Sequence, residues 1–148
     1  MGYSIWLNRG DSKSELKAKF GDVPKGGQYR LGDDDEDVSE GDLELYVTYN
    51  YSWYFYETID KDRGIRSVFG MRAGEAADKL EEALPKLDEM IAEEKRTGKV
   101  LSETWGAGED YDDESTDYWA VSAKNAKKAV EALIDLCRLA PDFTVDGD

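Results

Sequence analysis

The residues best suited to binding chemistry are the basic side chains that follow Ser122. Lys124, Lys127 and Lys128 fall in the first two turns of an expected helix, where free backbone N–H groups and the helix dipole favour an anion. Ser122 has the side chain that helix N-termini prefer. A phosphate or a carboxylate is therefore the ligand that this segment predicts.

A second basic group lies near the middle of the chain, where Arg63 and Arg66 follow an aromatic stretch. Guanidinium groups bind both anions and aromatic rings. If the two basic groups meet beside these rings, they form a basic, aromatic pocket for a nucleotide-like anion. The alternative is that the basic side chains pair with acidic segments of the same chain. The aromatic residues expected to line the pocket are Tyr49, Tyr51 and Trp53.

The acidic residues are concentrated in two segments. The chain has 34 Asp and Glu against 19 Lys and Arg, a net charge of −15. Eight acids without a base occupy residues 33–44, and seven without a base occupy residues 103–117. We expect two exposed loops, near 33–42 and 103–117, whose field favours a basic protein and disfavours direct contact with nucleic acid or membranes. The residues expected to contact this partner are Asp33, Asp34, Asp35, Glu36, Asp37, Asp110, Asp112, Asp113 and Glu114.

Motifs for catalysis or metal binding are scarce. The chain has no His, which excludes Ser-His-Asp and Cys-His sites and every His-ligated metal. Four acids of the first segment have the spacing of calcium-loop ligands, but Val38 stands where that loop needs glycine. We therefore expect no enzyme activity, no metal and no cofactor. A pair of carboxylates acting as acid and base is the remaining catalytic alternative.

The strands that would position these residues follow from alternating polarity. Residues 3–7 alternate and predict a first strand. Residues 43–56 also alternate, which predicts one long bent strand or two strands joined by a bulge. Residues 65–69 predict a further short strand. Because tyrosines fall on both faces of the middle strand, its second face should be covered by the other helix, a partner protein or a second copy of the chain.

The helices follow from apolar residues spaced three and four apart. A short helix is expected over residues 11–20, a longer one over 73–98 that Pro85 kinks or restarts, and a last one from Ser122 to Pro141. The single Cys falls on the apolar face of the last helix, which indicates a buried, inert thiol. The predicted core of these helices comprises Leu80, Leu84, Leu87, Ile91, Val130, Leu133 and Cys137.

The order of elements predicts one α+β domain over residues 1–148, a small antiparallel sheet with two amphipathic helices packed on one face. No apolar run is long enough for a signal or a membrane span, so the expected location is the cytoplasm.

Several short stretches between Thr48 and the C-terminus resemble small uncharacterised proteins of bacteriophages and prophages. They are Thr48–Ser52, Gly64–Arg66, Gly74–Ala76, Asn125–Ala129 and Pro141–Asp148. The resemblance brings no site residue with it, but it implies an accessory phage protein. The function expected in that setting is a non-enzymatic binding protein that inhibits a host protein through its acidic surface. Sequestration of a nucleotide-like small molecule is the alternative.

Overall fold

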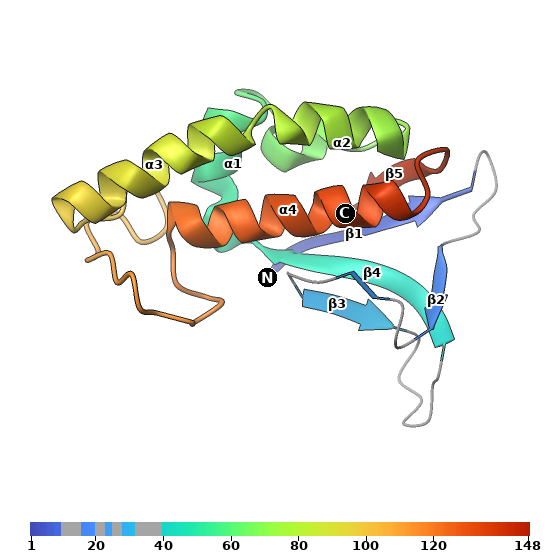
Figure 1. The fold of residues 1–148 in the computed structure, drawn as a ribbon, viewed down its shortest axis with the longest axis horizontal. Coiled ribbons are helices and arrows are strands. Elements are labelled where there is room, and N and C mark those ends of the chain that lie inside the picture. Colours follow the sequence, from blue (N-terminus) through green and yellow to red (C-terminus); the bar gives the residue numbers. More distant parts are fainter. Residues whose placement is uncertain (10–15, 20–22, 25–27, 32–39) are drawn as a thin grey trace.

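The computed structural model describes residues 1–9, 16–19, 23–24, 28–31 and 40–148 (Figure 1). A five-stranded antiparallel sheet is covered on one face by helices, which confirms the predicted α+β class. The elements are β1 (Gly2–Asn8), β2 (Lys17–Lys19), β3 (Gln28–Leu31), β4 (Glu40–Thr48), α1 (Ser52–Thr58), α2 (Ala73–Glu81), α3 (Leu84–Thr97), α4 (Ala123–Leu139) and β5 (Thr144–Gly147).

The sheet is built around β1, which lies between β4 and β5. Ile5 stands opposite Leu45 on one side and Gly147 on the other. Because side chains alternate along a strand, Tyr3, Ile5 and Leu7 all point into the core. β4 also pairs with β2 and β3, and α4 lies between the sheet and the pair α2 and α3 (Figure 1).

The middle strand is shorter than its alternation predicts, because β4 ends at Thr48. A 3₁₀ turn follows, in which the Thr48 hydroxyl accepts the N–H of Asn50, and Ser52 begins α1. The strand predicted to continue to residue 56 is therefore wrong beyond Thr48. Nearly every residue here is aromatic or apolar, so the helical period of three and four fits as well as alternation does. The residues of this stretch that are buried follow the helical spacing: Tyr51, Tyr54, Phe55 and Thr58.

Two further predictions are corrected. Residues 65–69 do not form a strand, because Gly64–Val68 is a 3₁₀ helix that Gly64 enters with a φ of 58°. The helix expected over residues 11–20 is also wrong where the structure describes it, since Lys17–Lys19 pairs with β4 as a strand. Residues 33–39 of the first acidic segment, and with them most of the calcium-like spacing, lie outside the described residues. The loop predicted near 33–42 is wrong at its end, because Glu40–Thr48 forms strand β4 and pairs with β2.

The helix signals near the C-terminus are confirmed. Pro85 lies in the first turn of α3, so the interrupted pattern is two helices. Gly98 ends α3 in the left-handed conformation, at φ 75°, and the Ser122 hydroxyl caps α4 by accepting the N–H of Asn125. Most of the predicted helical core is fully buried, whereas Leu84 and Ile91 lie half-buried at its margin.

One carboxylate lies inside the core. Glu94, on α3, has 0% of its surface exposed. Its Oε2 accepts the hydroxyl of Tyr54 on α1 at 2.5 Å and the backbone N–H of Leu101 at 2.8 Å. Its Oε1 accepts the N–H of Ala123, the first residue of α4, at 2.8 Å. Burial, reinforced by this carboxylate, raises the pKa of Tyr54, so its hydroxyl remains a donor. Glu94 thus joins α1, α3 and α4.

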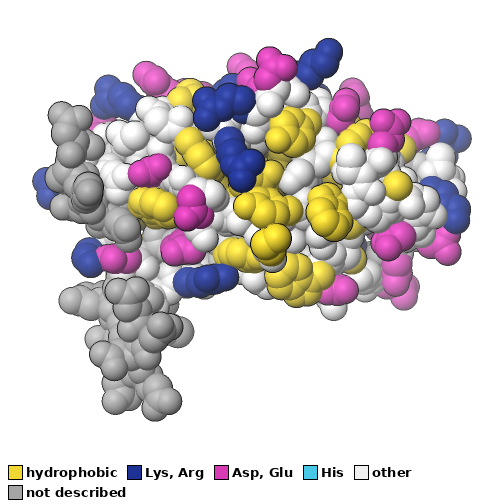
Figure 2. All heavy atoms as spheres, turned by 180° about the vertical axis from the view of Figure 1, so that it is seen from behind, with side chains coloured by type: hydrophobic (Ala, Val, Ile, Leu, Met, Phe, Trp, Pro, Cys, Tyr) yellow, Lys and Arg dark blue, Asp and Glu magenta, His cyan; other side chains and the backbone are white. Residues whose placement is uncertain are grey.

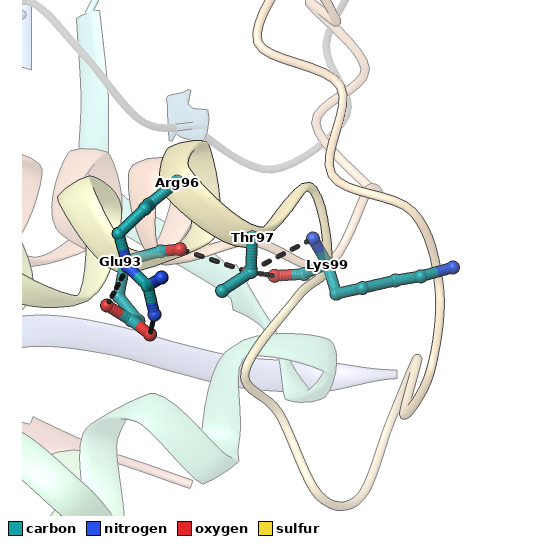
Figure 3. A network of polar contacts seen from close by, with 4 residues as sticks. All are labelled: Glu93, Arg96, Thr97 and Lys99. Carbon is teal, nitrogen blue, oxygen red and sulfur yellow. Dashed lines mark hydrogen bonds and ion pairs between the residues drawn. The ribbon is translucent and has the colours of Figure 1, made fainter.

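Replacing Glu94 should therefore destabilise the protein far more than replacing its neighbour. Glu94→Ala leaves three buried donors without a charged acceptor, and we expect it to lower the free energy of unfolding by at least about 3 kcal/mol. Glu93 makes an exposed ion pair with Arg96 at the end of the same helix (Figure 3), so Glu93→Ala should change it by less than about 1 kcal/mol. Urea unfolding measures both, and equal losses would contradict the role given to Glu94.

Candidate functional site

The second acidic segment, residues 103–117, connects α3 to α4 along the surface. Asp110, Asp112, Asp113 and Glu114, the residues predicted to contact a partner, are all exposed. The predicted contacts of the first segment lie outside the described residues; they are Asp33, Asp34, Asp35, Glu36 and Asp37. Within the part of the chain that the structure describes, we call residues 103–117 the acidic segment.

The acidic segment is attached to the helices on both sides of it. Lys99 makes an ion pair with Asp110, and Lys95 approaches Asp113 at 3.5 Å. Lys124 of α4 donates to the backbone carbonyl of Asp113 at 2.8 Å. These contacts act on the carboxyls: a hydrogen bond from Lys99 lowers the pKa of Asp110, and one from Tyr111 lowers that of Asp113. The lysines thus hold the segment while its outer carboxylates stay in solvent.

Two tryptophans that the sequence analysis did not assign to a site lie near the ends of the acidic segment, Trp105 within it and Trp119 two residues after it. Trp105 has 58% of its surface exposed and Trp119 has 48%, which is unusual for the largest apolar side chain. Trp119 contacts the rings of Tyr118 and Tyr46 edge-on, with centroids 5.1 and 6.3 Å apart, so its position is defined. Their placement at either end of the acidic run is visible in the sequence, but their exposure is not.

The start of α4 already holds an anion of the protein itself. The N–H of Ala123 donates to the buried Glu94 carboxylate, and that of Asn125 donates to Ser122. Ser122 is buried. These two N–H groups are therefore not available for the external phosphate or carboxylate that the lysines and Ser122 predict.

The three predicted lysines of α4 have different surroundings. Lys127 pairs with Asp88 of α3 at 2.7 Å, and this hydrogen bond raises the pKa of Lys127. Lys124 donates to the backbone of the acidic segment. Lys124 and Lys127 therefore bind groups of the same chain, which was the alternative prediction. Lys128 is exposed and has no ion pair within the described part of the chain. It lines a pocket together with Tyr51, another predicted ligand residue.

The predicted arginines lie elsewhere. The Arg66 guanidinium carbon is 4.8 Å from the ring centroid of Tyr3 and 5.7 Å from that of Tyr49, and its Nη2 donates to the Tyr49 hydroxyl at 3.4 Å. Arg63 is exposed in a turn. Neither arginine lines the pocket that contains Lys128. Arg66 thus contacts Tyr49, and Lys128 lines a pocket with Tyr51. The two basic groups do not line one pocket, contrary to the prediction.

Arginine also stacks on a tyrosine at the outer face of the sheet. The Arg30 guanidinium carbon lies 4.6 Å from the ring centroid of Tyr46, the tyrosine that Trp119 contacts from the side. Trp53, the last of the predicted aromatic residues, packs edge-on against Tyr54. Seen from behind the view of Figure 1, hydrophobic side chains gather in the middle of the molecule with Lys and Arg side chains among them (Figure 2). That a second copy of the chain covers this face stays a prediction.

Other functional classes find no support in the described residues. No group of three or more Cys, Asp or Glu side chains among them could hold a metal ion. None of the helices they form combines the length and apolarity needed to cross a membrane. Cys137 is buried, which raises the pKa of its thiol to about 12. No protein-family model, curated protein or solved structure matches the chain.

The attachment of the acidic segment should depend on pH in a defined direction. Because the pKa of Asp110 is lower in the folded protein, its pair with Lys99 stabilises the segment above the ordinary Asp value of 3.8 and is lost as the pH falls through the lowered value. In an NMR titration we expect the Asp110 carboxyl to titrate below 3.8, and Lys99→Met to return it toward that value. An unchanged titration in Lys99→Met would contradict the attachment.

Proposed function

We propose that this protein is a non-catalytic binding protein that docks its acidic segment on a basic surface of a partner protein. The observation that carries the proposal is the combination of exposed carboxylates with two exposed tryptophans, Trp105 within the acidic segment and Trp119 two residues after it. Carboxylates accelerate encounter with a basic surface, and tryptophan is the side chain that contributes most often to binding energy at an interface.

The attachment of the segment supports binding over a purely solubilising role. Asp112, Glu114 and Asp117 are exposed and make no ion pair with a basic residue in the part of the chain that the structure describes. They are therefore open to a partner, while Lys99 and Lys124 hold the backbone that carries them. A segment that is already ordered loses less conformational entropy on binding, which favours affinity.

The phage setting that the sequence resemblance suggests gives this docking a consequence. Basic protein surfaces commonly bind nucleic acid, so an acidic protein that covers such a surface on a host protein inhibits it by occupation. This mode of inhibition needs no catalytic residue. It agrees with a chain that has no His and a buried, unreactive thiol.

The alternative, binding of a nucleotide-like anion, retains one supporting contact. Arg66 is held between Tyr3 and Tyr49, and no carboxylate pairs with it among the described residues. However, Lys124 and Lys127 are engaged within the chain, and the N–H groups of Ala123 and Asn125 are occupied. The alternative therefore rests on Arg66 and on Lys128, which do not line the same pocket.

A charge-matched comparison tests the docking. The probe is a fluorescein-labelled peptide of alternating Arg and Leu. Three carboxylates are neutralised either in the acidic segment (Asp112→Asn, Glu114→Gln and Asp117→Asn) or on α2, α3 and the turn between them (Glu75→Gln, Glu89→Gln and Glu82→Gln). We expect the first variant to slow association about tenfold at low salt and the second less than about twofold. The difference should vanish at 1 M salt, where the Debye length falls to about 3 Å.

Trp105→Ala should change the rate of dissociation. Its ring contributes apolar contact and no charge, so we expect faster dissociation of the peptide with little change in association. Stopped-flow anisotropy measures both rates. Equal slowing by the two charge variants, with no effect of Trp105→Ala, would show that only the net charge attracts the peptide and would refute the docking site.

A further inference from the structure

A pocket of about 140 Å³ lies between α4, the end of the acidic segment and the 3₁₀ turn that precedes α1. Its two aromatic walls present rings and not hydroxyls, because Tyr51 donates its hydroxyl to the backbone carbonyl of Tyr118, and Tyr118 donates to the carbonyl of Tyr46 at 3.1 Å. Ala129 completes the apolar part. The tyrosine rings and Ala129 thus form an apolar wall that favours an apolar group on a ligand.

One polar end of the pocket is a buried amide. Asn125 has only 7% of its surface exposed. Its Nδ2 donates to the carbonyls of Asp117 and Ala120, at 2.9 and 2.7 Å, which fixes the orientation of the side chain. No residue in the described part of the chain bonds its Oδ1. A buried amide held by its nitrogen thus offers an acceptor, which calls for an N–H or O–H donor on a ligand.

The other polar end is the ammonium group of Lys128. Unlike Lys124 and Lys127, this exposed lysine has no ion pair among the described residues. Among the described residues it is the only cation that lines the pocket, and Thr116 is also part of the lining. The ammonium group of Lys128 is therefore suited to bind a carboxylate of a ligand.

We propose that this pocket binds a small zwitterion of the amino-acid type, with its carboxylate on Lys128, its ammonium on Asn125 Oδ1 and an apolar side chain between the tyrosine rings. The acidic surroundings favour this ligand over a simple anion, because Asp117 and the rest of the acidic segment attract an ammonium and repel a net negative charge. The volume is close to the roughly 150 Å³ of a cavity that accepts benzene, which is too small for a nucleotide.

Three probes of nearly the same shape test this assignment. L-valine carries both charged groups, isovalerate lacks the ammonium, and isobutylamine lacks the carboxylate. We expect L-valine to bind saturably and to shift the NMR signals of the Asn125 side-chain amide and the Ala129 N–H. The two analogues should bind at least tenfold more weakly. Failure of L-valine to shift these signals, or equal binding of isovalerate, overturns the proposal.

Matched lysine variants locate the carboxylate. Lys128→Met keeps the length of an exposed side chain and should weaken L-valine binding tenfold or more. Lys86→Met removes an exposed lysine of α3 that does not line the pocket, and should leave binding unchanged. Equal losses in the two variants would refute a contact with Lys128. Trp105→Ala should retain L-valine binding, so this test and the docking test fail independently.

Discussion

The structure depends on the burial of one carboxylate. A charge taken out of water costs several kcal/mol unless hydrogen bonds replace its hydration, so Glu94 must be surrounded by donors for the protein to fold. The donors come from three places in the chain: Tyr54 of α1, the backbone of Leu101, and the first N–H of α4 at Ala123. The hydrogen bonds of Glu94 therefore tie α1 and the start of α4 to α3 and place the positive end of α4 against an internal negative charge.

The same carboxylate closes the loop that carries the acidic segment. Leu101 precedes this segment and Ala123 follows it, and both bind Glu94, so its two ends are brought to one point inside the protein. A flexible acidic loop would spread its charge over many conformations. Here Glu94 closes the two ends, and Lys99 and Lys124 hold the middle through Asp110 and Asp113. The negative charge is thus displayed in one place, which is what recognition of a particular basic surface requires.

How much the sequence could predict differs between its parts. The spacing of three and four in α2, α3 and α4, the cap at Ser122 and the left-handed Gly98 are local signals, and they were sufficient. The run of tyrosines before α1 satisfies both periods, so packing alone decides between strand and helix. Glu94 stands in a charged stretch, Glu93–Arg96, and nothing local distinguishes it as the buried member. The occupied start of α4 could not be foreseen for the same reason, because its anion comes from another helix.

The two proposed sites share one structural element, and this has a thermodynamic consequence. Thr116 lines the pocket, and the buried amide of Asn125 donates to the carbonyl of Asp117. Both Thr116 and Asp117 belong to the acidic segment. A ligand that occupies the pocket stabilises the arrangement in which that end of the segment is docked on α4. A partner that recognises the docked segment stabilises the same arrangement. Because coupling between two binding events is reciprocal, any strengthening of one proposed binding event by the other would act in both directions by the same factor.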